Sequence, residues 1–271
     1  MRVVIFCDME GISCIETWEQ VHSGTAFYQE ARKLYTDEMN AAVRGARAAG
    51  VREVIVVDCH GAGGGYTFKS FLPERLELGA EYVFGHPWAR YIIPFEQGCD
   101  AILFVGAHAM AGTPNGVLCH TVSSESWHNA WINDTLVGES GILAAIAGCW
   151  DVPATFVSGD EATCQEVRTL LGAEVVTAPV KIGLGRFSAR NMAPKDACSL
   201  IEMRVAQALS MRNWPKPYKV KAPVTFKVEL VTPDRVHDFI GRAGVRIEGP
   251  RMVSSTGDTF WQAWDQIWYR N

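Results

Sequence analysis

The feature that most constrains the fold of this chain is a series of short, uninterrupted apolar runs set apart by longer segments. Four such runs are rich in β-branched residues and lack polar alternation: residues 2–7, 53–58, 101–106 and 154–159. Runs of this kind are typical of strands buried on both faces, as in parallel sheets. Residues 25–50 instead carry apolar residues at helical spacing and end at a glycine, which predicts a helix. The order predicts an α/β fold with a mixed, mostly parallel sheet sandwiched by helices.

The pattern changes after Pro194, where a second, smaller region begins. Residues 224–230 (VTFKVEL) alternate strictly between apolar and polar positions, which predicts a strand with one exposed face. We therefore divide the chain into an α/β core over residues 1–193 and a smaller α+β lobe over residues 194–271, which would serve oligomerisation or a substrate channel. Other predicted elements are a hairpin over 120–134, helices over 68–78, 139–149, 194–212, 233–242 and 257–269, and strands over 81–84 and 245–253.

Charge and apolar content exclude several classes of protein. The 25 basic and 30 acidic residues give a net charge of −5, which argues against binding to nucleic acid or to an anionic membrane. No apolar run approaches the roughly 18–20 residues that a bilayer-spanning helix needs. The apolar run at the N-terminus, Val3 to Cys7, is too short for the core of a signal peptide. We therefore expect a cytoplasmic protein.

Acidic and histidine side chains follow the predicted strands at the points where they end. Asp8 and Glu10 follow the first strand, His60 the second and His108 the third, and Glu139 opens the helix after an Asn-Asp turn. Ligands of open α/β sheets bind outside the carboxyl ends of the strands. The spacing of Asp8 and Glu10 places both carboxylates on one side of an extended chain. Carboxylate and imidazole donors suit zinc, and also manganese or cobalt.

Five donors are too many for one tetrahedral catalytic zinc with an open position. If Asp8 bridges two metals, each ion has three protein donors, with room for a bridging hydroxide and a substrate. Two such ions form a hydrolytic clamp. A structural role remains the alternative for each residue, because an acid after a strand or at a helix start also caps a turn or interacts with the helix dipole. A non-catalytic binding protein with structural carboxylates is therefore a further hypothesis.

Other catalytic motifs fail their main tests. Residues 60–65 (HGAGGG) resemble a lipase-type oxyanion loop, but the sequence has no G-x-S-x-G elbow. It also has no G-x-G-x-x-G after the first strand and no phosphate-binding P-loop. The adjacent pairs Cys59-His60 and Cys119-His120 point to opposite faces of an extended chain, so neither is a ready dyad.

Two further groups of residues stand out by type. A stripe of tryptophans at helical spacing predicts core packing or a subunit contact: Trp261, Trp264 and Trp268. Four histidines have no supporting context: His22, His86, His128 and His237.

Several short motifs together resemble a known family. In chain order they are DMEGIS (8–13), GAHA (106–109), GVLCH (116–120) and INDTLVGE (132–139). Their combination and order resemble the D-aminopeptidase DppA family of metallopeptidases, peptidase family M55. The resemblance covers the predicted core and is weak beyond it.

The resemblance implies a binuclear zinc aminopeptidase that acts on short peptides of D-amino acids. By position it makes Asp8 the bridging ligand, with Glu10 and His60 completing one zinc site and His108 and Glu139 the other. It also makes His120, in GVLCH, the catalytic histidine. In the mechanism it suggests, a metal-bound water attacks the scissile carbonyl while His120 stabilises the oxyanion or shuttles the proton. The family further implies a ring-shaped homo-oligomer, a decamer with an internal channel.

The chain departs from the family pattern beside His60. Val57 stands where the family has Asn, and Gly61 to Gly65 replace a polar loop that we expect to border the substrate. Metal binding survives these changes, but specificity for D-Ala-type substrates does not follow from the resemblance. An alternative function is therefore a metal-dependent hydrolase of another amide or of a small non-peptide substrate on the same fold.

Overall fold

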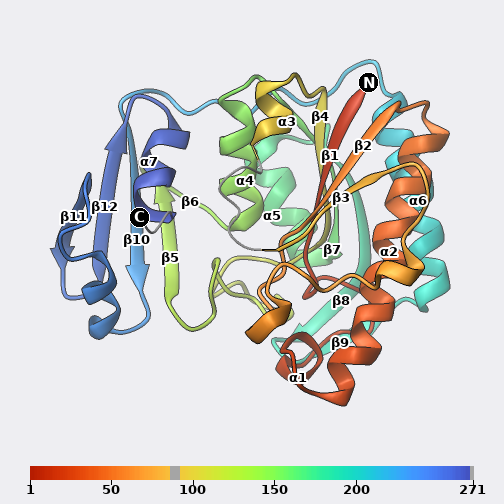
Figure 1. Cartoon of the computed structure of the whole chain (residues 1–271), viewed down its shortest axis with the longest axis horizontal. Helices are drawn as coiled ribbons and strands as arrows, with labels where there is room; N and C mark the ends of the chain where they lie inside the picture. The colour runs from red at the N-terminus through yellow and green to blue at the C-terminus, as the bar shows by residue number, and fades with distance from the viewer. Residues whose placement is uncertain (86–91, 269–271) are drawn as a thin grey trace.

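The computed structural model describes residues 1–85 and 92–268 and contains two sheets (Figure 1). The larger sheet has the strand order β3-β2-β1-β4-β7-β8-β9, and all its neighbouring pairs are parallel except β8 with β9. Its four central strands are the predicted ones: β1 (Arg2–Cys7), β2 (Glu53–Asp58), β4 (Ala101–Ala107) and β7 (Ala154–Asp160). The outer strands are β3 (Glu81–Val83), β8 (Val176–Gly185) and β9 (Ser188–Asn191). The predicted mixed, mostly parallel sheet is confirmed.

Helices cover both faces of this sheet, and alternate residues of β1 show the two layers. Val3 and Ile5 pack into one core with the helices α2 (Ala26–Ala48) and α6 (Pro194–Ser210). Val4 and Phe6 pack into a second core on the opposite face. That core includes residues of α4 (Glu139–Gly148) and α5 (Glu161–Leu171). Figure 1 shows the two helix layers on either side of the sheet.

The smaller sheet is antiparallel and has the order β11-β12-β10-β5-β6. Its strands are β5 (Trp127–Ile132), β6 (Thr135–Leu136), β10 (Val224–Leu230), β11 (Val245–Gly249) and β12 (Met252–Gly257). Buried residues alternate along β10, as its sequence pattern predicted. The terminal helix α7 (Phe260–Trp268) packs on this sheet through Trp264, which contacts Trp127 and Phe226. The tryptophan stripe is therefore a core feature.

The two sheets divide the chain differently from the predicted boundary at residue 193. Strands β5 and β6 lie inside 1–193 but pair with β10 of 194–271. Helix α6 lies beyond the boundary but packs on α2, against the larger sheet. The division into 1–193 and 194–271 as folding units stays a prediction.

Several local predictions differ from the structure. Residues 68–78 and 233–242 contain only the 3₁₀ turns η2 (Pro73–Arg75) and η3 (Pro233–Phe239), and a further turn is η1 (Gly64–Tyr66). The predicted strand over 245–253 is the hairpin of β11 and β12. The expected hairpin over 120–134 begins only at Trp127. Short helices also form, α1 (Trp18–Val21) and α3 (Ile93–Glu96). Within the described ranges, no helix has the length and apolarity needed to cross a bilayer.

Candidate metal centre

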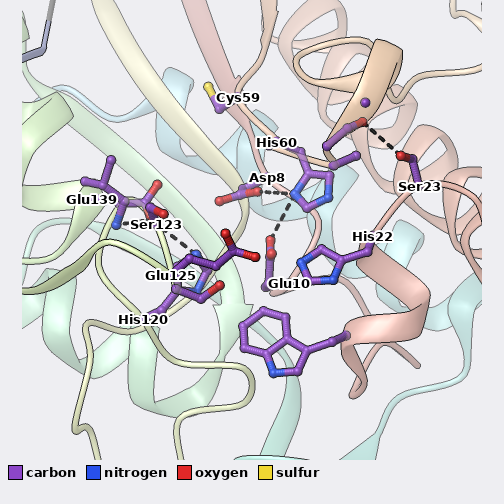
Figure 2. A pocket seen from close by; sticks show the side chains of 17 residues that line it. Asp8, Glu10, His22, Ser23, Cys59, His60, His120, Ser123, Glu125 and Glu139 are labelled. Atoms are coloured by element: carbon purple, nitrogen blue, oxygen red, sulfur yellow. Dashed lines mark hydrogen bonds and ion pairs between the residues drawn. The ribbon is translucent and has the colours of Figure 1, made fainter. Parts of the chain in front are cut away.

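The carboxyl ends of three adjacent parallel strands bring the predicted side chains together. Strands β1, β2 and β4 are neighbours in the larger sheet, and all three end at the same edge. Asp8 and Glu10 follow β1, His60 follows β2 and His108 follows β4. Glu139 enters from the side as the first residue of α4. Figure 2 shows four of these five side chains around one cavity.

Asp8 lies between the two histidines and contacts each with a different oxygen. Asp8 Oδ1 is 3.0 Å from His60 Nδ1, and Asp8 Oδ2 is 3.4 Å from His108 Nε2. Each histidine also has its own second carboxylate. His60 Nδ1 lies 3.2 Å from Glu10 Oε2, and His108 Nε2 lies 2.9 Å from Glu139 Oε1. The five side chains thus form two donor groups that share Asp8.

Backbone carbonyls orient both imidazole rings toward the acids. His60 Nε2 is 2.7 Å from the carbonyl of Val21, and His108 Nδ1 is 3.0 Å from the carbonyl of Ala109. A carbonyl only accepts hydrogen bonds, so each of these nitrogens carries a proton and donates it. The other nitrogen of each ring is then the one that faces the carboxylates. Metal-binding histidines have this arrangement, because the second hydrogen bond fixes the tautomer and the ring plane.

The charges of the cluster shift the pKa values of its members in opposite directions. Burial lowers the pKa of His60 and His108, but the charges of Glu10 and Glu139 and contacts with Asp8 outweigh it, so both pKa values lie well above the usual range. Burial raises the pKa of Asp8, but the close contacts with His108 and His60 and the charges of both rings outweigh it, so this pKa lies well below its usual value. The acids are therefore stable in this buried place only with positive charge beside them.

The donor atoms fit a divalent cation. Glu10 Oε2 and His108 Nε2 are buried and make no hydrogen bond of good geometry with a described residue, despite their charged neighbours at 2.9–3.4 Å. Buried polar atoms without a hydrogen bond are rare and call for a ligand. Donor atoms of Asp8, Glu10 and His108 lie within 4.8 Å of one another, as do those of His108, His120 and Glu139. Oxygen and imidazole donors in this number suit zinc, manganese or cobalt.

His120 stands beside the donor cluster with a different environment. Its ring stacks on that of His108 at a centroid distance of 3.9 Å, and its Nε2 is 3.8 Å from Glu139 Oε1. Its Nδ1 donates to the carbonyl of Leu118 over 2.9 Å, which leaves Nε2 with a free electron pair. Burial, together with the charge of His108, lowers the pKa of His120, so the ring is neutral at neutral pH.

A cavity of about 480 Å³ opens over these residues. Trp18 and His22 form one wall, and their stacked rings have centroids 5.6 Å apart. Gly61 to Gly64 form another wall, and Ser23 Oγ donates to the Gly63 carbonyl; that this loop borders the substrate stays a prediction. Glu125 on the rim extends its carboxylate into the cavity, and no lysine or arginine is among the described lining residues (Figure 2).

Sequence reasoning found the donors but missed most of the cavity wall. His22 has no supporting context in the sequence, and no periodic pattern or motif marks Trp18 or Glu125. Trp18 begins the short helix α1, His22 directly follows that helix, and Glu125 lies on the segment before β5. His128 and His237 are not among the lining residues. His86 lies outside the described residues.

The donor cluster at the strand ends and the cavity above it define an α/β protein of the metallohydrolase class. Residues 1–269 match the family model Peptidase_M55, D-aminopeptidase, and the chain belongs to this family. Family membership makes it a hydrolase of the aminopeptidase type. A D-aminopeptidase of Bacillus subtilis (strain 168) is 33% identical over 223 residues, which are 80% of this chain and 77% of that protein.

A solved structure has the same fold. It is the Zn-dependent D-aminopeptidase DppA from Bacillus subtilis, described as a self-compartmentalizing protease. The match has a TM-score of 0.87 at 28% sequence identity and covers 98% of this chain and 95% of that one. Because nearly the whole chain is covered, the smaller sheet and α7 belong to the shared fold.

Proposed function

We propose that this chain is a binuclear zinc aminopeptidase that releases the N-terminal residue of short D-amino-acid peptides or amides. The observation that carries the proposal is the pair of donor groups sharing Asp8, each with a histidine turned toward it by a backbone carbonyl. The zinc dependence and the D-aminopeptidase activity of the DppA neighbour support the choice of metal and substrate.

Under this proposal each ion would have three protein ligands. Asp8, Glu10 and His60 would hold one zinc ion, and Asp8, His108 and Glu139 would hold the other. Zinc held by these residues would supply the Lewis acidity that amide hydrolysis needs. The alternative group of His108, His120 and Glu139 would make His120 a ligand. The proton on Nδ1 leaves His120 Nε2 to serve either role, and its neutral state suits it to accept a proton.

The cavity wall binds and orients the substrate. Its described lining offers carboxylates and neither lysine nor arginine, so it fits the amino end of a peptide better than the carboxyl end. Glu125 accepts hydrogen bonds from the α-ammonium group. The indole of Trp18 and the small residues Gly61 to Gly64 leave room for the side chain of the N-terminal residue.

Metal content and a substrate panel test the proposal. Purified protein should contain about two zinc ions per chain and should hydrolyse D-aminoacyl amides well above their L-enantiomers. A chelator should abolish this turnover, and added zinc should restore it. Full turnover in protein shown to be metal-free would overturn the proposal.

The wall of Gly61 to Gly64 favours one rival function, hydrolysis of another amide or a small non-peptide substrate. Three of these residues are glycines and the fourth is Ala62, so this wall offers no polar side chain to recognise a particular peptide. Strong metal-dependent hydrolysis of such compounds, with weak activity on D-aminoacyl amides, would favour the rival.

We also propose a homo-oligomer, a decamer, in line with the self-compartmentalizing neighbour. Light scattering of the purified protein measures its size, and a monomer at micromolar concentration would contradict it. The cytoplasmic location stays a prediction.

A further inference from the structure

A lysine is buried beneath the metal centre. Lys181 lies on β8, and 1% of its surface is exposed. Its Nζ is 2.6 Å from the carbonyl oxygen of Glu10, 2.8 Å from that of Ile12 and 2.5 Å from that of Ile15. All three acceptors belong to one stretch of backbone, residues 10–15, which directly follows the strand β1.

The geometry fixes the charge of this lysine. Three carbonyl oxygens require three N–H donors, and only the protonated ammonium has three. Lys181 forms no ion pair with a described side chain, so its charge is compensated by backbone dipoles and, at longer range, by Asp160, Glu16 and Glu38. A buried ammonium with three carbonyl partners restrains the backbone that carries them, because moving a carbonyl away leaves a buried charge without its hydrogen bond.

The stretch bonded to Lys181 begins at one proposed ligand and directly follows another. The carbonyl of Glu10 is bonded to Lys181, while the side chain of Glu10 lines the cavity above. Asp8 is two residues earlier, just after β1, where its N–H donates to the carbonyl of Val105. Fixing the peptide planes from residue 10 to residue 15 therefore fixes where Glu10 lies relative to Asp8.

Other contacts hold the same stretch from the same side. Ser13 donates its N–H to Glu38 and its hydroxyl to the carbonyl of Met192, next to β9. The N–H of Cys14 donates to Asn191 Oδ1, at the end of β9. These contacts anchor single residues, whereas Lys181 joins three points of the stretch at once.

We propose that Lys181 is a positioning residue of the metal centre, whose ammonium group sets the conformation of residues 10–15 and so prearranges Asp8 and Glu10 for the metal. The inference rests on the proposed function, because it needs Asp8 and Glu10 as ligands. Groups that orient metal ligands typically change metal affinity 10–100-fold when they are removed.

The test compares Lys181→Met with the wild type and with Val180→Ala. Methionine keeps an unbranched apolar chain but leaves the three carbonyls without a donor. Val180 is the preceding residue of β8 and is buried in the same apolar core as Ile12 and Ile15, so its truncation weakens the packing of the same strand but removes no hydrogen bond to residues 10–15. Competition with a chelator measures the Zn²⁺ affinity of each metal-free protein, and the visible spectrum of the Co²⁺-loaded protein reports the ligand geometry.

We expect Lys181→Met to bind Zn²⁺ about 10–100-fold more weakly and to shift the Co²⁺ spectrum, while Val180→Ala stays within about threefold of the wild type. Equal affinity in Lys181→Met and the wild type, or an equal loss in Val180→Ala, would overturn the positioning role. If Lys181→Met does not fold, Lys181→Gln supplies two N–H donors instead of three and should show a smaller loss, so wild-type affinity there overturns the role as well. A wild type that binds no zinc would instead overturn the proposed function itself.

Discussion

At the scale of single residues, the three histidines of the metal centre differ in what the second nitrogen of each ring faces. His60 and His108 each donate one N–H to a carbonyl and turn the other nitrogen toward carboxylates. His120 also donates to a carbonyl, but its free nitrogen is 3.8 Å from the nearest carboxylate oxygen of Glu139. Because all three rings have a carbonyl partner, the greater distance of its free nitrogen from the acids is what leaves His120 available for proton transfer.

Replacement of His120 by alanine should stop turnover without removing the metal. We expect kcat to fall about 10²–10⁴-fold, because a proton carrier beside the reacting group is lost. Metal analysis should still give about two zinc ions per chain. His22→Ala is the matched control, since His22 lines the same cavity without contacting Glu139, and it should change KM more than kcat. Loss of one zinc ion from His120→Ala would show that His120 is a ligand.

Replacement of Glu125 by glutamine should weaken substrate binding selectively. Its carboxylate is exposed at the rim and forms no hydrogen bond or ion pair with a described residue, so the change leaves the fold intact. We expect KM to rise about fivefold for substrates with a free amino group, with kcat nearly unchanged. Ser124→Ala, on the same rim, is the control. An unchanged KM would exclude contact between Glu125 and the ammonium group.

Glu38 should make stability depend on pH. Burial raises the pKa of this carboxyl group from 4.5 to about 7, so the folded state holds the proton more tightly than the unfolded state. Stability from this group is then present at low pH and is lost as the pH rises from 4.5 to about 7, at a cost on the order of 3 kcal/mol. Glu38→Gln stays neutral and can keep the bond from Ser13.

Urea unfolding of metal-free protein measures this effect. Near pH 8 Glu38→Gln should be more stable than the wild type, and near pH 5 the difference should largely vanish. A variant that is equally or less stable near pH 8 would contradict a raised pKa for Glu38.

At the scale of elements, what the sequence predicts depends on how regular each pattern is. The four central strands are uninterrupted apolar runs, so their ends, and with them the five donors, could be located along the chain. Strand β8 was missed because Pro179, Lys181 and Gly183 interrupt its apolar pattern. The contacts of Lys181 could not be predicted either, since its acceptors are carbonyls 166–171 residues away. Every residue has a backbone carbonyl, so the residue type does not indicate which carbonyls accept a hydrogen bond from the lysine.

The end of β4 and the turn after β1 are in direct backbone contact. Gly106 has a φ of +70°, and a Cβ there would lie 2.1 Å from the carbonyl oxygen of Asp8. Gly11 donates its N–H to the carbonyl of Gly106 over 2.8 Å. The end of β4 and the turn after β1 can therefore pack this closely only because residue 106 has no side chain.

Gly106→Ala should damage the metal centre more than the fold of the remaining chain. Alanine costs about 1–2 kcal/mol for the left-handed backbone and displaces Asp8 in addition. Gly112→Ala is a matched control, because Gly112 has a φ of +79° but no atom near its Cβ position. We expect both variants to unfold at lower temperature and only Gly106→Ala to lose zinc affinity. Equal zinc affinity in the two variants would contradict this account.

At the scale of the whole molecule, the smaller sheet is part of the structure around the site. The chain between His120 and Glu139 contains strands β5 and β6, so these strands connect the two site residues. Strand β10 fixes β5 by pairing along Phe226 to Leu230. The lobe thus supports two site residues from the side, in addition to any role in assembly.

A fragment of residues 1–193 should therefore fail to form the metal centre. It lacks β10, which leaves one edge of β5 unpaired, and it lacks α6, which exposes buried apolar surface of α2 and the larger sheet. We expect the fragment to aggregate or to bind no zinc, as measured by size-exclusion chromatography and metal analysis. A soluble, folded fragment with bound zinc would instead support 1–193 as an independent domain.

The pairing of β5 with β10 also has a consequence for the time course of biosynthesis. All six predicted site residues precede β10 in the chain and are synthesised before it. The hairpin of β5 and β6 is therefore made before the strand with which β5 pairs. Until that strand is made, an apolar strand edge is open to pairing with other chains. We therefore expect the proposed metal centre to form only after residues 224–230 have been made, so that the nascent chain up to that point has the donor residues without the strand that holds β5.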